Sequence, residues 1–369
     1  RRKGMRDRKM HSSHVSHRRS SGIELLRIIA MYAILSHHFV MHNGFSIEQL
    51  PPSFTRYFLI AFMAGWGKVG VVVFFTISVW FLVGKQQSIR SSFYRVWILE
   101  RELLFYIILL TAFYSIFDRE DISAKSILTG FLPILTNKWW YVTAYAIFLV
   151  LMPAMQSGLA ILNSKQHRNL AVFSFLLVGV VPFIPGGIQT GDTSLTFIFL
   201  FVIITYFKWH VYPMKTGHII VLFFVGLLSL LGQYLVSEAV YTIFGRDGLV
   251  DLPMLYGFPV LLTAFGLFLL FERFDFYSSV INRIAMSSFA VYLITDYSSS
   301  RILLWDKMFN LGNLLDLPLF CFSILLILFA IYAVCTVFDF LRQVLFAFTV
   351  DRNKGKWFNV LEKKLSDAH

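Results

Sequence analysis

Ionisable side chains interrupt the first long apolar segment of the chain, residues 23–41. Glu24, Arg27 and His38 all lie in it. At about 100° per residue, positions 27 and 38 return to within roughly 20° of the same direction, and Glu24 falls on the same stripe one turn before Arg27. An ionisable side chain at the centre of a bilayer costs roughly 2.5 to 3.5 kcal/mol, so these residues are functional candidates. We expect this column to face the protein interior, with His37 pointing about 100° away.

The residue types in the column suit more than one function. An arginine can bind an anionic group by charge-assisted hydrogen bonds. A neutral histidine can remove a proton from a hydroxyl or form a covalent intermediate itself. His38 and Asp296 also fit the polar relay of a proton-coupled carrier. A transporter of glycans or lipid-linked sugars is a further alternative, since such proteins are also polytopic and basic inside. These residue types alone leave the classes open.

The composition is that of an integral membrane protein. The chain is 57% hydrophobic and 15% charged, with 40 Phe and a mean hydropathy of +0.67, whereas soluble domains carry about 25% charged residues. The apolar runs are about 20 residues long, which is the length that a helix needs to cross the hydrocarbon core. We predict an all-α integral membrane protein, a bundle of about ten transmembrane helices. The predicted spans are 23–41, 62–83, 97–117, 139–155, 169–185, 194–212, 217–236, 255–272, 284–304 and 318–346.

The distribution of Lys and Arg predicts the orientation. With both termini cytoplasmic, 24 of the 33 Lys and Arg residues fall in cytoplasmic segments, six in outer segments and three within spans. This is a strong positive-inside bias. We predict basic cytoplasmic tails over 1–22 and 347–369 and a transmembrane domain over 23–346, in a multi-pass protein of the bacterial plasma membrane. The net charge of +12 then reflects topology and contact with anionic membrane lipid, and gives no support for nucleic-acid binding.

Metal and thiol chemistry are not indicated. Cys321 and Cys335 are fourteen residues apart on one predicted helix, too far to bridge each other, and we interpret them as small apolar residues. The chain has no CxxC, HExxH or Walker A pattern. We therefore predict no metal site.

Two further polar clusters lie between residues 65 and 101. Lys68 sits in a glycine-rich stretch whose glycines allow close approach of a helix or a ligand. It either snorkels to the outer interface or belongs to a site. Arg90, Arg95 and Arg101 either bind lipid phosphate and anchor the topology or bind a phosphate-rich ligand.

The last cluster covers residues 287–301. Tyr292, Asp296 and Ser299 share a face if the segment is one helix, and Arg301 follows near its outer end. Asp296 either forms a structural ion pair with another helix or takes part in catalysis. Three tryptophans are expected in the aromatic belts at the membrane interface: Trp139, Trp140 and Trp305.

These segments together resemble the membrane-bound acyltransferase-3 family. The arginine and histidine separated by ten residues, Arg27 and His38, are similar to its opening signature. Residues 67–78 resemble its Gly-x-x-Gly-Val…Phe-Phe…Ser-Gly segment, with Val79 in place of the last glycine. Residues 138–153 resemble its Trp-containing fourth span. The resemblance covers nearly the whole chain.

The ninth predicted span carries the other specific part of the resemblance. Residues 288–301 are similar to a family segment close to Tyr-Leu-Ile-His-Asp followed by an arginine, with Thr295 in place of the histidine. The paired arginines usual before the third span correspond only loosely to Arg95 and Arg101. We expect an unfused member, without a hydrolase-like domain after the last span.

The resemblance implies transfer of an acyl group, usually acetyl from cytoplasmic acetyl-CoA, to a sugar hydroxyl of a surface polysaccharide or lipid-linked glycan. Acetyl-CoA is then a co-substrate, and no cofactor is bound permanently. Arg27 and His38 are about 16 Å apart along the helix, which is comparable with the reach of a pantetheine arm. The expected catalytic residues are His38, Arg27, Glu24 and Asp296. The expected donor contacts are Arg90, Arg95, Arg101 and Ser78, and the expected acceptor contacts are Lys68, Trp140, Tyr292 and Arg301.

Overall fold

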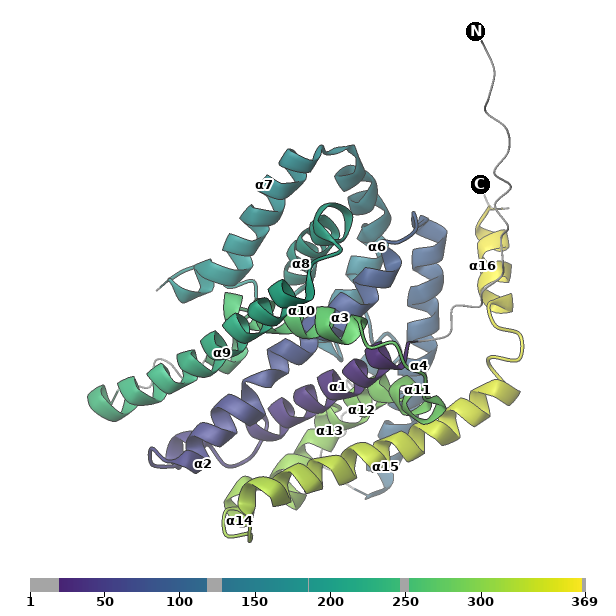
Figure 1. The fold of residues 1–369 in the computed structure, drawn as a ribbon. Helices are drawn as coiled ribbons and strands as arrows, with labels where there is room; N and C mark the ends of the chain where they lie inside the picture. The colour runs from purple at the N-terminus through teal and green to yellow at the C-terminus, as the bar shows by residue number, and fades with distance from the viewer. Residues whose placement is uncertain (1–19, 118–127, 185, 246–251, 367–369) are drawn as a thin grey trace.

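The computed structural model describes residues 20–117, 128–184, 186–245 and 252–366. Within these ranges the chain forms helices joined by short connections and contains no strand (Figure 1). The predicted all-α class is confirmed. The predicted basic tail over 1–22 lies almost wholly outside the described residues, and so do parts of the predicted outer segments 118–138 and 237–254.

The helices have the lengths that a multi-pass membrane protein needs. Six helical stretches are long and apolar enough to cross a membrane: Ser21–Met41, Phe54–Leu82, Trp140–Ile161, Ser194–Val211, Thr216–Phe244 and Phe320–Phe348. Shorter apolar helices cover Phe258–Glu272 and Ser279–Thr295. The count of ten spans and the cytoplasmic position of both termini stay predictions.

The elements follow one another along the chain with these bounds: α1 (Ser21–Met41), α2 (Phe54–Tyr57), the π-helical η2 (Phe58–Ala64), α3 (Trp66–Leu82), α4 (Ile89–Phe117), α6 (Trp140–Ile161), α7 (Ser164–Phe175), α8 (Ser194–Tyr206), α9 (Thr216–Phe244), α10 (Phe258–Glu272), α11 (Ser279–Met286), α12 (Ser288–Thr295), α13 (Ser298–Arg301), the π-helical η8 (Ile302–Met308), α14 (Leu311–Leu314), α15 (Phe320–Phe348) and α16 (Lys356–Ser366).

Helix α1 lies in the middle of the bundle, with α3, α10, α11 and α12 packed around it (Figure 1). The glycines of α3 allow its close approach to α1, as the sequence predicts. A Cβ at Gly70 would lie 2.5 Å from the carbonyl oxygen of Ala30, and one at Gly67 would lie 2.3 Å from Cγ of His37. Side chains at these two positions would push the helices apart, so small residues are required where α1 and α3 cross.

The predicted span 284–304 is not one helix, which corrects the sequence analysis. Helix α12 ends where Asp296 takes a non-helical conformation (φ −96°, ψ 0°) and Tyr297 is extended. Tyr292, Asp296 and Ser299 therefore do not share one helix face, although all three are buried. In a continuous helix, positions five residues apart point about 140° away from each other. The break lets the Arg301 side chain reach back to Asp296.

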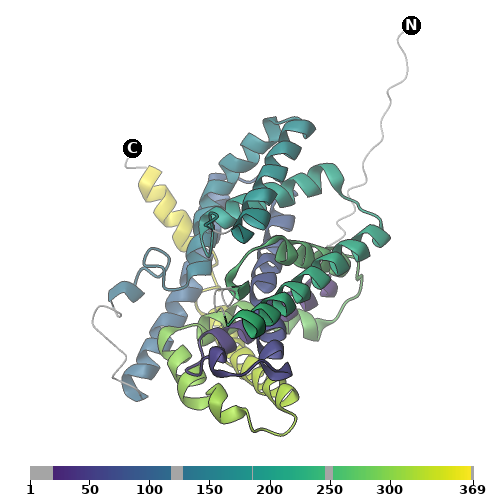
Figure 2. The same ribbon diagram turned by 90° about the vertical axis from the view of Figure 1, so that its left-hand side faces the viewer.

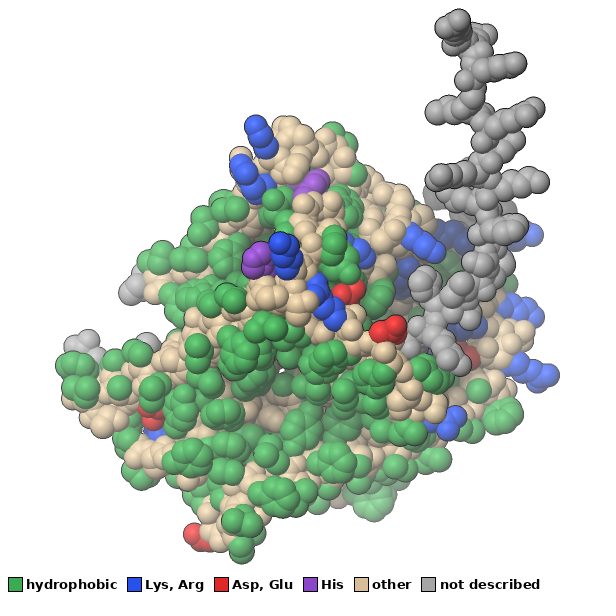
Figure 3. Space-filling view, viewed as in Figure 1, with side chains coloured by type: hydrophobic (Ala, Val, Ile, Leu, Met, Phe, Trp, Pro, Cys, Tyr) green, Lys and Arg blue, Asp and Glu red, His purple; other side chains and the backbone are tan. Residues whose placement is uncertain are grey.

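The outer surface is largely apolar, as Figure 3 shows for one side of the molecule. Val221 and Leu228 of α9 are 60% and 67% exposed, and Phe329 and Leu341 of α15 are 63% and 64% exposed. Soluble monomers rarely expose apolar patches of this extent. Lys and Arg side chains are visible mainly at the upper and right-hand edges of this view. The surface is that of a protein embedded in lipid.

Candidate active site

The ionisable residues of α1 line two cavities and the gap between them. Near the start of α1, Glu24 and Arg27 lie 3.4 Å apart (Oε2 to Nε), and the Arg27 guanidinium lies 5.5 Å from the ring centre of Phe74. They line a cavity of about 440 Å³, the Arg27 cavity. Its other polar wall residues are Ser78, Glu102, Tyr145 and Lys354.

A second cavity lies near the end of α1. This Lys68 cavity has a volume of about 150 Å³, and its walls include His37, His38, Lys68, Asp192 and Arg301. Trp140 and His42 also line it. Charged, imidazole and indole side chains thus form much of its wall, beside several aliphatic ones.

A narrow gap of about 20 Å³ lies between the two cavities. It shares Phe74, Tyr141 and Phe289 with the Arg27 cavity, and Ile34, Val71, Trp140 and His38 with the Lys68 cavity. The three spaces therefore form a row along α1. His38 stands where the gap opens into the Lys68 cavity.

His38 is buried, at 6% exposure, and lies beside a carboxylate. Its Nδ1 is 3.4 Å from Oδ1 of Asp296, and Nε2 of His42 is 3.8 Å from the same oxygen. Arg301 donates to this oxygen through Nε and also contacts it through Nη2, each at 2.8 Å. The carboxylate can therefore orient the His38 ring and balance a charge on it, which leaves Nε2 for a reacting group.

The two adjacent histidines have different surroundings. The ring of His37 turns toward η2, where its Nδ1 lies 2.7 Å from the carbonyl oxygen of Ala64, and it packs on Gly67. His38 faces α12, with its ring centre 5.9 Å from that of Tyr292. Both histidines line the Lys68 cavity, but only His38 also lines the gap and lies beside Asp296.

Lys68 does not snorkel to an interface, so that alternative of the sequence analysis is wrong. Its side chain is 4% exposed and its Nζ donates to both carboxylate oxygens of Asp192, at 2.7 and 2.8 Å. Tyr256 donates to Oδ1 of the same carboxylate at 2.6 Å. The ammonium also lies 5.5 Å from the ring centre of Trp140. The Lys68 side chain is therefore held in a fixed position in the cavity wall by its partners.

The predicted donor residues are only partly brought together. Ser78 lines the Arg27 cavity with Arg27, whereas none of the three arginines of α4 lines it in the described structure. Arg90 donates to the side chain of Asn359, and Arg95 donates to Ser91 of its own helix. Arg101 forms an ion pair with Asp351 at 2.9 Å and lines a separate cavity.

Two of the three tryptophans predicted for the interface belts lie in the core instead. Trp139 is 1% exposed and Trp305 is fully buried. Trp140, the third, lines both the gap and the Lys68 cavity. A belt residue needs a ring that is exposed at the membrane surface. The Trp139 ring instead packs against Tyr297, and the Trp305 ring packs against Phe39.

Sequence reasoning missed His42, Asp192 and Tyr256. His42 follows His38 by four residues, so the same helical spacing that selected His38 could have found it. Asp192 lies in a connection between predicted spans, and only the need of a buried Lys68 for a counter-charge points to it. No pattern in the sequence indicates Tyr256.

His38, His42 and Asp296 also have the ligand types of a metal site, with donor atoms within 4.8 Å of one another. The Arg301 guanidinium, however, contacts the same Asp296 oxygen that lies near both histidines, through Nε and Nη2, each at 2.8 Å. A divalent cation there would meet a fixed positive charge at close range. The charge on Arg301 therefore favours a histidine–carboxylate pair over a metal centre at this point.

Comparison with known proteins identifies the family of the chain. The sequence model of the acyltransferase-3 family, described as an acyltransferase domain, matches residues 20–335. The match includes the elements from α1 to α14 and about half of α15, and with them His38, Asp296, Lys68 and Arg27. No curated protein and no solved structure matches the chain. The match covers most of the chain and all described wall residues of the three spaces except Lys354, and the protein is a member of the acyltransferase-3 family of membrane-bound acyltransferases.

Proposed function

We propose that the protein transfers an acetyl group from cytoplasmic acetyl-CoA to a hydroxyl of a cell-surface polysaccharide or a lipid-linked glycan. One observation carries the proposal: a buried histidine paired with a carboxylate stands between two cavities of different character. The transfer of a group from one substrate to another needs such a meeting point, with each substrate entering from its own side. Family membership favours this acyltransferase over the carrier and transporter alternatives.

The Arg27 cavity is the proposed donor site. Arg27 and His38 are eleven residues apart on α1, a rise of about 16 Å, which matches the reach of a pantetheine arm. A thioester held in this cavity would present its carbonyl carbon at the gap between Phe74 and Tyr141. The gap admits little more than a water-sized group, which suits a short acyl chain such as acetyl.

The proposed chemistry uses His38 as a base. Nε2 removes the proton of the acceptor hydroxyl, the hydroxyl oxygen forms a bond to the acetyl carbon, and the carbon–sulfur bond breaks. The proton on His38 then passes to the leaving thiolate of CoA. Asp296 holds the ring and balances the imidazolium that forms. In the alternative order, His38 itself accepts the acetyl group and then passes it to the hydroxyl.

The Lys68 cavity is the proposed acceptor site. Trp140 offers an aromatic face, and Lys68 and Arg301 offer donors for sugar hydroxyls. Three polar atoms at this point are buried without a well-formed hydrogen bond to the described residues: Nδ1 of His38, Oη of Tyr292 and Oδ2 of Asp296. Buried polar groups without partners are costly, so the Tyr292 and Asp296 atoms are suited to bind a substrate.

Mass spectrometry of surface polysaccharide tests the proposal. Polysaccharide from cells that carry the gene should contain O-acetyl groups that are missing from cells without it. Wild-type protein should restore these groups, and His38→Ala protein of equal membrane abundance should not. Identical acetylation in both strains, or restoration by the His38→Ala variant, would contradict the proposed function.

A further inference from the structure

The chain beyond the family match folds back over α4. The family model ends at residue 335, within α15, whereas the described chain continues to residue 366. After α15, Asp351 pairs with Arg101 of α4, and Phe358 of α16 packs edge-on against Tyr94 of α4 with ring centres 5.4 Å apart. Figures 1 and 2 both show α16 beside α4 at the edge of the molecule.

This returning segment closes a cavity against α4, which we call the Trp97 cavity. Its volume is about 550 Å³, within the range of about 300 to 1,000 Å³ typical of small-ligand sites. Trp97 and Arg101 of α4 form one wall, and Asn353, Lys356 and Trp357 form the other. Two indole rings and two cationic side chains thus face one space.

Some polar and aromatic groups of this cavity are not fully paired within the described structure, although Arg101 contacts Asp351 and Val350 through Nη1. Arg101 Nε is buried and makes no hydrogen bond with the described residues. Trp357 is 73% exposed. Lys356 is exposed and forms no ion pair within the described structure. Cationic groups beside free aromatic faces are the arrangement that binds a nucleotide, because phosphates pair with the cations and the base stacks on the ring.

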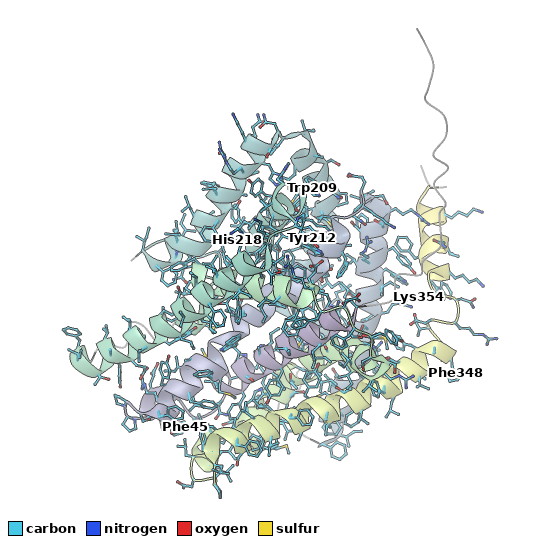
Figure 4. All side chains as sticks on the ribbon, in the orientation of Figure 1. Phe45, Trp209, Tyr212, His218, Phe348 and Lys354 are labelled. Atoms are coloured by element: carbon cyan, nitrogen blue, oxygen red, sulfur yellow. The ribbon has the colours of Figure 1, made fainter. Side chains whose placement is uncertain are left out.

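The Trp97 cavity adjoins the Arg27 cavity. Arg101 lines the first and its neighbour Glu102 lines the second. On the opposite wall, Asn353 and Gly355 line the first, and Lys354 between them lines the second. Figure 4 labels Lys354 at this position, between α4 and α16. Helix α4 and the returning segment thus contribute wall residues to both cavities.

We propose that the Trp97 cavity binds the 3′-phospho-ADP end of the acyl-CoA donor. The proposal rests on the proposed function and adds residues outside the family domain to the donor site. Arg101 and Lys356 pair with the phosphates, and the adenine ring stacks on Trp97 or Trp357. The pantetheine arm then runs past Lys354 into the Arg27 cavity and toward His38.

Direct binding to the detergent-purified full-length protein tests the proposal without the need for turnover. The probe is 3′-phosphoadenosine 5′-diphosphate, measured by isothermal titration calorimetry. Lys356→Gln and Trp357→Leu, both at exposed positions, should each weaken binding, by about 10-fold for the charge and roughly 5- to 150-fold for the stacking ring. Lys165→Gln, an exposed lysine of α7, should bind within twofold of wild type. Unchanged affinity in both cavity variants, or no binding by wild type at millimolar probe, would overturn the proposal.

A kinetic comparison separates this proposal from the proposed function. Lys356→Gln should raise KM about 10-fold for acetyl-CoA but not for S-acetylpantetheine, which lacks the nucleotide. Equal KM changes for the two donors would refute the nucleotide site and leave the acyltransferase function intact. If the variants weaken probe binding as expected but the wild-type protein transfers no acetyl group, the proposed function is refuted instead. If the variants lose the phosphatidylglycerol that wild type binds while their affinity for the probe is unchanged, the cavity is a lipid headgroup site and the proposal is overturned.

Discussion

Replacement of His38 is the most direct perturbation of the proposed mechanism. General-base catalysis contributes about 10²- to 10⁴-fold, or about 2.7 to 5.4 kcal/mol of activation free energy. His38→Ala should lose at least this factor in kcat. His38→Gln keeps the approximate size and some hydrogen bonding beside Asp296, but its amide cannot take up a proton. It should therefore be nearly as inactive as His38→Ala.

The neighbouring His37 provides the matched control. Its Nδ1 contacts the carbonyl oxygen of Ala64, and its ring does not reach the gap where the donor is proposed to arrive. His37→Ala removes a buried hydrogen-bonding group, at a cost of about 1 to 3 kcal/mol in stability. The folded fraction of this variant should retain much of the wild-type kcat. The two histidine variants should thus differ in activity by orders of magnitude.

The assay is transfer of radiolabelled acetyl from acetyl-CoA to polysaccharide by protein reconstituted in liposomes. Activity is divided by the amount of monodisperse protein, so that loss of folding is not counted as loss of chemistry. If His38 only holds two helices together, His38→Gln should largely restore activity to a folded protein. An active His38→Gln variant, or a reversed order of the two histidine variants, would refute the assignment of the base.

Three further predictions concern groups around His38. Asp296→Asn keeps the shape but removes the charge that orients the ring, so kcat should fall about 10²-fold with a smaller change in KM; a pure KM effect would instead make Asp296 a binding residue. Lys68→Met leaves the Asp192 carboxylate without its cation and should lower Tm. The double variant Lys68→Met/Asp192→Leu should regain part of the loss. Equal Tm values for wild type and both variants would contradict a stabilising pair. Gly70→Val forces side-chain atoms into the carbonyl of Ala30 and should abolish folded protein in size-exclusion chromatography, whereas Gly232→Val, which has open space around it, should not. Equal yields of the two glycine variants would argue against the tight crossing of α1 and α3.

The sequence by itself determined the class of the protein and the central residues of its site. Long apolar runs can satisfy their backbone hydrogen bonds in lipid only as helices, so composition alone predicts a helical membrane protein. Helical periodicity placed Glu24, Arg27 and His38 on one face of α1, and the structure places all three along the same row of cavities. Local geometry sufficed because the three residues belong to one helix.

Only the tertiary structure decided which residues from other segments meet this face. The break after α12 returns Arg301 to Asp296, whereas in the predicted continuous helix these two positions point about 140° away from each other. Asp192 lies 124 positions from Lys68, and their pairing follows from packing between distant segments rather than from any local pattern. Two of the three tryptophans predicted for the interface belts, Trp139 and Trp305, are core residues for the same reason. The types and spacing of residues determine the helix face on which a side chain lies. The residues of other segments that contact this face depend on how all the helices pack together.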